Sequence, residues 1–160
     1  MLWNRIIGAF TFRKGVYAEV ESDTSFTQTA WLIVAVVAFL NQLGSYASTN
    51  IVGWLVGAVI ATISAVIGFA LASFIINWVG SVVFKADVTF DEMIRTLGLA
   101  YVWNIISLLG ILGIITALSC LVSPIIFIAS ILGLVAWFVA AKEALDLDWL
   151  QTRLFRSPTS

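Results

Sequence analysis

The sequence predicts an all-α integral membrane protein, a four-transmembrane-helix bundle with an N-terminal amphipathic interfacial helix. Residues 24–84 and 96–141 contain no charged residue, although a soluble surface needs charge at short intervals. Apolar stretches of about 18 or more residues are typical of membrane spans. The 160-residue chain is 61% hydrophobic with a mean hydropathy of +1.07, and we expect one membrane domain over residues 1–160.

Polar residues and one proline divide these stretches into four spans. A bilayer core of about 30 Å needs about 20 helical residues, and the polar break at residues 44–50 separates spans at about 26–43 and 51–84. Because proline removes a helical hydrogen bond, we expect a turn at residues 119–124 that ends at Pro124. This turn gives third and fourth spans at about 97–118 and 125–141. The length of the second span fits three arrangements: a straight helix that is tilted or projects from the bilayer, a broken helix, or a re-entrant hairpin.

Two helix starts carry the capping-box pattern, in which a Ser or Thr cap is followed three residues later by Glu or Gln. Ser25 and Gln28 form one such pair, and Thr89 and Glu92 form the other. The second pair predicts that the helix of the third span begins before the membrane. Its first turn then holds acidic residues, which the helix dipole favours.

The charged residues predict the topology. All 8 basic and 9 acidic residues lie in residues 1–24, 85–95 and 142–160, and four spans place these three pieces on one face. The positive-inside rule makes that face cytoplasmic. We therefore expect a cytoplasmic or interfacial segment at 1–24, a cytoplasmic tail at 142–160, both termini in the cytoplasm, and a bacterial cytoplasmic membrane as the location.

The first twenty residues are amphipathic. Apolar residues follow helical spacing and basic residues lie beside them: Trp3, Ile6, Ile7, Phe10, Arg13 and Lys14. This pattern predicts a helix on the surface of an anionic leaflet. The alternative is that the apolar face docks onto a protein or onto the loop around Phe90.

Small residues mark candidate helix contacts, because helices in lipid associate through close packing rather than through a hydrophobic drive. The candidate packing or partner residues are Gly53, Gly57, Ala61, Ala65, Gly110 and Gly113. They predict contacts within the bundle, with another integral membrane protein or with a second copy of the chain. The sequence leaves these alternatives open.

Polar residues inside the spans are the other candidates. Asn77 and Asn104 lie at similar depth, and we expect a hydrogen bond between them, with a small-molecule or lipid contact as the alternative. No Asp, Glu, Lys or Arg lies inside a predicted span, which disfavours a proton relay, an ion pump or a voltage sensor. The chain has no histidine, and we predict no cofactor, no metal and no nucleic-acid partner.

Several segments resemble the Yip (Ypt-interacting protein) domain family in its prokaryotic form. They are residues 5–10 (RIIGAF), 16–23 (VYAEVESD), 90–101 (FDEMIRTLGLAY) and 137–148 (WFVAAKEALDLD), in the family's order. Relatives often carry a proline shortly after the Ala-Tyr pair, where this chain has residues 102–104 (VWN). Many relatives also continue into a fifth span, which we do not expect here, because a short basic amphipathic tail follows the acidic motif.

The resemblance implies a multi-span helical protein with a cytoplasmic N-terminus. Eukaryotic relatives are associated with small Ypt/Rab-type GTPases, vesicle traffic and membrane shaping, and no catalytic residue carries over. We therefore expect a non-enzymatic membrane scaffold or accessory subunit of a membrane protein complex, organising lipid or partner proteins. The alternative is a small oligomeric transporter or channel. An intramembrane enzyme is disfavoured because Cys120 has no histidine partner.

Overall fold

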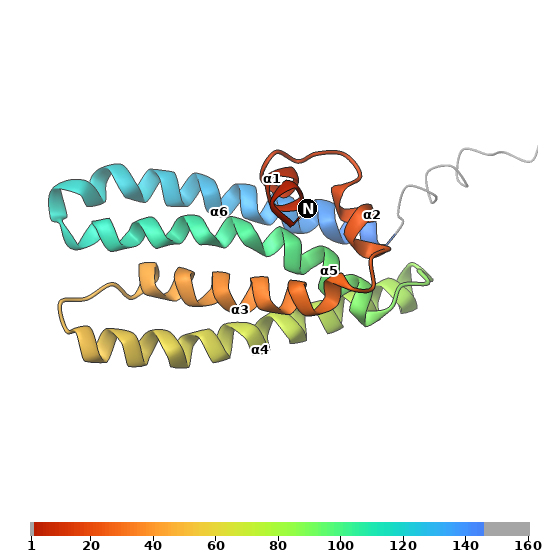
Figure 1. The fold of residues 1–160 in the computed structure, drawn as a ribbon, viewed down its shortest axis with the longest axis horizontal. Helices are drawn as coiled ribbons and strands as arrows, with labels where there is room; N and C mark the ends of the chain where they lie inside the picture. Colours follow the sequence, from red (N-terminus) through yellow and green to blue (C-terminus); the bar gives the residue numbers. More distant parts are fainter. Residues whose placement is uncertain (1, 146–160) are drawn as a thin grey trace, which may run out of the picture.

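The structure is a computed structural model that describes residues 2–145 (Figure 1). Within these residues it contains helices and no strands. The elements in chain order are α1 (Leu2–Phe10), α2 (Val16–Glu21), α3 (Phe26–Ser45), α4 (Ile51–Val83), α5 (Phe90–Ala100), the 3-10 helix η1 (Tyr101–Ile114) and α6 (Thr116–Ala144).

Four apolar helical segments of residues 2–145 form the bundle, and each is long enough to cross a membrane. They are α3, α4, the continuous α5–η1 pair and α6. The predicted fold class is therefore confirmed. The α3–α4 loop and the η1–α6 turn lie at one end, here called the far end, while α1, α2 and the α4–α5 loop lie at the other, here called the charged end (Figure 1). The predicted tail at 142–160 lies largely outside the described residues, although α6 continues to Ala144.

The second span is one unbroken α-helix of 33 residues, which rules out the broken and re-entrant alternatives. Its N-cap is Asn50, whose Oδ1 accepts a hydrogen bond from the Gly53 amide at 3.2 Å. At 1.5 Å per residue, α4 is about 50 Å long, well beyond a bilayer core of about 30 Å. It is also one of the two least buried spans, so most of its apolar side chains face outward.

The predicted turn before Pro124 is wrong. The chain turns at Ile115, whose backbone is extended, and Pro124 lies inside α6. Membrane helices tolerate an internal proline because neighbouring groups satisfy the freed carbonyl. The third span therefore ends at Ile114 rather than at residue 118, and the fourth begins about nine residues earlier than predicted and ends at Ala144.

The early turn follows from the helix type of η1. A 3-10 helix rises about 2.0 Å per residue against 1.5 Å in an α-helix, so 14 residues cover about 28 Å. Its side chains repeat every three residues, which collects polar and small residues on one face. These are Tyr101, Asn104, Ser107, Gly110 and Gly113. The period-three pattern of the sequence therefore matches the observed helix type.

One of the two predicted capping boxes is present. At the start of α5, the Thr89 amide donates to Glu92 Oε2 at 2.6 Å, and the Glu92 amide donates to Thr89 Oγ1 at 3.3 Å. The box at Ser25 is wrong, because Ser25 has helical backbone angles and no cap bond of its own. Instead, its amide and hydroxyl both donate to the Asp23 carboxylate, at 3.1 and 2.5 Å.

Candidate functional site: the N-terminal cap

Residues 2–23 fold onto the charged end of the bundle as a compact unit, here called the N-terminal cap. Its second helix is deeply buried: Val16, Tyr17 and Val20 are at most 1% exposed. They join the same core cluster as α5, whose residues 93–100 are all buried. Burial in this apolar core raises the pKa of the Tyr17 hydroxyl, with a smaller contribution from Glu143. The cap is thus part of the packed fold.

The first helix is held at its C-terminal end by Trp103 of η1. The Trp103 Nε1 donates to the Ala9 carbonyl at 3.3 Å. Its ring lies between Phe10, edge-on at 5.1 Å between centroids, and Phe12, stacked at 5.6 Å. Phe12 adopts a left-handed backbone with φ of 51° to reach this position, which is uncommon for a residue with a side chain. This aromatic contact fixes the turn between α1 and α2.

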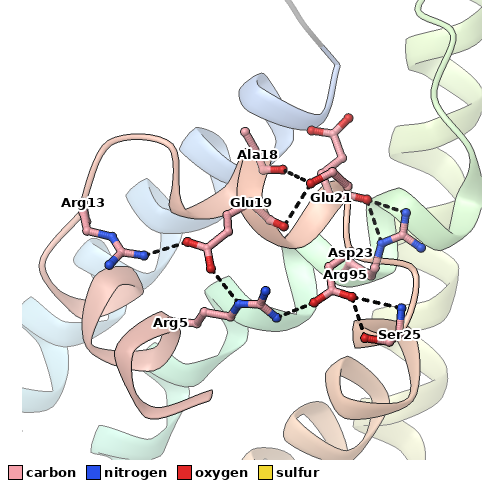
Figure 2. Close-up of polar contacts among 9 residues, drawn as sticks. Arg5, Arg13, Ala18, Glu19, Glu21, Asp23, Ser25 and Arg95 are labelled. Carbon is pink, nitrogen blue, oxygen red and sulfur yellow. Dashed lines mark hydrogen bonds and ion pairs between the residues drawn. The ribbon is translucent and has the colours of Figure 1, made fainter. Parts of the chain in front are cut away.

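A buried arginine joins the end of α2 to the bundle, and Figure 2 shows its bonds to Glu21. Arg95 of α5 is 4% exposed. Its Nε and Nη2 both donate to the Glu21 carbonyl, at 2.9 and 2.5 Å, and its Nη1 donates to Thr27 Oγ1 at 3.1 Å. The Glu92 carboxylate lies 3.9 Å from the Arg95 Nη2. The planar guanidinium thus fixes the end of α2 against α3 and α5.

Ion pairs organise the outer surface of the cap (Figure 2). Arg5 donates to Glu19 at 3.0 Å and to Asp23 at 2.8 Å, and Arg13 donates to the second oxygen of Glu19 at 2.9 Å. The hydrogen bond to Glu19 raises the pKa of Arg5. The bonds from Ser25 and then from Arg5 lower the pKa of the Asp23 carboxyl. These bonds link α1, α2 and the start of α3.

The predicted interfacial residues separate into two groups. Trp3 and Ile7 are exposed, at 70% and 44%, while Ile6 and Phe10 pack against the core. Arg13 is paired with Glu19, and Lys14 is exposed in the turn. The cap therefore uses part of its apolar face to dock onto the bundle and leaves another part on the surface. It is built from two short helices, where the sequence pattern predicted one.

The predicted packing glycines differ in their surroundings. A Cβ at Gly110 would lie 2.5 Å from the Gly44 carbonyl oxygen, so α3 and η1 approach closely there. A Cβ at Gly53 would meet only its own cap residue, and a Cβ at Gly57 or Gly113 would meet nothing within 4 Å. Ala61 and Ala65 are half-buried. Gly44 was not identified from the sequence, where it was assigned to the polar break.

The predicted hydrogen bond between Asn77 and Asn104 is wrong. The Asn77 Nδ2 donates to the Val88 carbonyl at 2.9 Å and so ties α4 to the loop before α5. The Asn104 Nδ2 donates to the Tyr101 carbonyl at 3.2 Å. The Asn104 carbonyl accepts from Asn41 Nδ2 at 3.0 Å, which joins η1 to α3. Asn77 therefore joins two elements through its side chain, whereas Asn104 meets α3 through its backbone carbonyl.

Comparison with known protein families assigns the chain to one of them. The family model described as Yip1 domain matches residues 7–157, nearly the whole chain. The chain belongs to the Yip1 domain family. No curated protein and no solved structure matches it. The resemblance to the Yip domain family is therefore confirmed, and this Yip1-domain protein is embedded in a membrane through its four apolar spans.

Two residues of the third span organise the cap of this Yip1-domain protein. Trp103 and Arg95 both come from the third span, and together they hold the two halves of the cap. The sequence analysis identified neither residue as a site, although Arg95 lies within the family-like segment 90–101 and Trp103 lies two residues after it. The available signal was the position of Arg95 directly before the charge-free residues 96–141.

Chemically, the cap provides a charged surface and a fixed apolar helix. Among residues 2–145, no three His, Cys, Asp or Glu side chains lie close enough together to hold a metal ion. Cys120 is exposed near the far end of the Yip1-domain bundle, remote from the cap. The arrangement is suited to contact with a partner or with lipid at the charged end.

Proposed function

We propose that this Yip1-domain protein is a non-enzymatic membrane scaffold or accessory subunit, which binds another integral membrane protein or a second copy of itself through the N-terminal cap. One observation carries the proposal: the cap is held rigidly on the bundle while α1 leaves Trp3 and Ile7 on the surface. A preorganised surface loses little conformational freedom on binding, which favours affinity.

We further propose that the charged end lies in the cytoplasm, at a bacterial cytoplasmic membrane. The segregation of all Lys and Arg on one side of four spans supports this orientation. The test uses single cysteines at two exposed positions in a Cys120→Ser background, Thr49→Cys in the α3–α4 loop and Lys14→Cys in the cap. In intact cells, a membrane-impermeant maleimide should label the first and should label the second only after permeabilisation. The reverse pattern would invert the topology.

Partner binding is tested by purifying the tagged full-length chain in a gentle detergent and quantifying what elutes with it. A matched pair of variants separates the cap from the rest of the surface, because Ile7 and Ile125 are similarly exposed at 44% and 50%. For the wild type and for Ile125→Ser, we expect either a second membrane protein that elutes in a stoichiometric amount with the chain, or a homo-oligomer. Ile7→Ser should lower its amount about fivefold, the effect of about 1 kcal/mol at an interface residue. A clean monomer for the wild type, or equal binding by both variants, would contradict the proposal.

The second candidate function is a small oligomeric transporter or channel. One observation favours it: a hollow of about 370 Å³ at the far end lies between α3, η1 and α6 and is lined by serines and glycines. The serines are Ser45, Ser107, Ser119 and Ser123. Flux of small polar solutes into liposomes that contain the purified chain tests it. A filling variant such as Gly113→Leu should block the flux if the hollow is part of the path.

A further inference from the structure

A second hollow lies beneath α1 and contains no exposed polar atom. It has a volume of about 340 Å³ and lies between α1, α3 and η1. Its roof is formed by α1, through Leu2, Trp3 and Ile6. Its floor is formed by α3, through Leu32 and Val36, and Ile105 of η1 closes it. It is here called the α1 groove. Its floor residues are 64% and 48% exposed, so the groove is open toward the surroundings of the bundle.

Trp103 holds α1 at its C-terminal end, the ion pairs of Arg5 hold its middle, and the groove lies beside its first residues. Phe10 and the Ala9 carbonyl are fixed by Trp103, whereas Trp3 near the other end is the most exposed residue of the roof. Arg5 bonds to Glu19 and Asp23 and lines no part of the groove. The first half of α1 therefore overhangs α3 and turns its apolar side chains toward that helix.

The environment of the floor indicates what fills the groove. The floor belongs to α3, an apolar helix within the charge-free stretch, and this part of the chain is membrane-embedded. Water does not occupy an apolar hollow readily, because it finds no hydrogen-bond partner there. An empty groove would forfeit the dispersion contacts of its walls. A bilayer surrounds the apolar spans, so acyl chains are the apolar material present at the floor of the groove.

We propose that the α1 groove binds one acyl chain of a bilayer phospholipid, enclosed by α1, α3 and η1. A chain at the open surface of the bundle touches protein on one side, whereas a chain in the groove touches it on three sides and gains more dispersion contact. This lipid contact belongs to the proposed scaffold function, and it depends on that function only in requiring that the bundle lies in a membrane. Lipid binding and partner binding are measured separately, so the two proposals fail separately.

The experiment places the full-length chain in vesicles of dioleoylphosphatidylcholine that contain a trace of phosphatidylcholine with a diazirine on one acyl chain. After illumination, mass spectrometry maps the adducts to residues. The test variant is Val36→Trp, which fills the groove from its floor. The control is Ile67→Trp on α4, an outward position of similar exposure at 55% that lines no part of the groove. Thermal unfolding in detergent verifies that both variants fold.

We expect adducts at Trp3, Leu32 and Val36 about threefold more often than at Ile67, in line with contact on three sides instead of one. Val36→Trp should reduce labelling at Trp3 and Leu32 to the level of Ile67, and Ile67→Trp should leave the enrichment unchanged. Uniform labelling of all exposed apolar positions would overturn the proposal. Labelling weaker at the groove than at Ile67 would overturn it too, because protein from a second copy or from residues 146–160 would then cover the groove.

Discussion

Replacing Arg95 with methionine should release the N-terminal cap from the bundle. The substitution keeps a long side chain of similar reach, so it leaves little cavity, but it removes the donors that meet Glu21 and Thr27. The Glu21 carbonyl then loses both of its bonds from the guanidinium. Arg95→Met therefore tests whether the hydrogen bonds of the guanidinium, rather than apolar packing, hold α2 in place.

The magnitude follows from the number and kind of bonds. A hydrogen bond from a charged donor contributes about 1.5 to 3 kcal/mol. Two of the three bonds share one acceptor, and removal of a buried cation also relieves its desolvation cost, so the sum is an overestimate. We expect a loss of about 3 kcal/mol in the free energy of cap docking, which corresponds to about a 150-fold shift of the docking equilibrium.

Hydrogen exchange followed by mass spectrometry measures this shift in residues 16–23 of the detergent-solubilised chain. Exchange there should accelerate by about the same factor, while α4 keeps its protection. The matched control is Arg13→Met, because Arg13 makes an ion pair at 48% exposure, and such pairs contribute about 0 to 1 kcal/mol. Equal exchange in Arg95→Met and wild type, or an equally large effect of Arg13→Met, would refute the reasoning.

Three further predictions concern packing, the aromatic contact and pH. Gly44→Ala should lower the melting temperature in detergent by an amount that corresponds to about 1 to 3 kcal/mol, because its Cβ would lie against the backbone of η1. Gly57→Ala should not lower it, because a Cβ there would meet nothing within 4 Å. Trp103→Phe keeps a ring but loses the bond to α1, so amide exchange in α1 should rise about fivefold, the effect of about 1 kcal/mol; unchanged exchange would show that the ring alone holds the helix. Since the pKa of Asp23 is lowered by its bonds from Ser25 and then Arg5, its stabilising contribution is present above about pH 4 and is lost as the pH falls through that lowered pKa. Resistance of the cap to proteolysis should therefore be constant from about pH 8 to 5 and fall below about pH 4 in the wild type, and Asp23→Asn should remove this step.

Charge and hydropathy were sufficient to predict the four spans that residues 2–145 contain, and their order. The second span was placed to within one residue, at Ile51–Val83, because a polar break and a charged loop bound it. The turn between the third and fourth spans was misplaced because proline was taken as a break. In a membrane helix, neighbouring groups satisfy the carbonyl that proline leaves free, so Pro124 is accommodated within α6.

The residues that organise the candidate site were harder to predict, because their roles depend on long-range contacts. Arg95 reads in the sequence as one more cytoplasmic charge, and only the fold brings Glu21 and Thr27 to it across about 70 residues. Gly44 likewise becomes a contact residue only when η1 crosses α3 at that point. The three-residue repeat of polar and small residues in η1 was present in the sequence, and a search for that period would have found it.

The same 3-10 segment relates the height of the bundle to the thickness of the surrounding bilayer. Residues 101–114 cover about 28 Å as a 3-10 helix and would cover about 21 Å as an α-helix. Conversion of residues 101–114 from a 3-10 helix to an α-helix would therefore shorten the third span by about 7 Å. It would also rotate Ser107 and Gly110 off the face that meets α3, since an α-helix does not repeat every three residues. Hydrophobic mismatch in a thinner membrane thus acts directly against the α3–η1 contact, so lipid chain length and helix packing in this protein are energetically coupled.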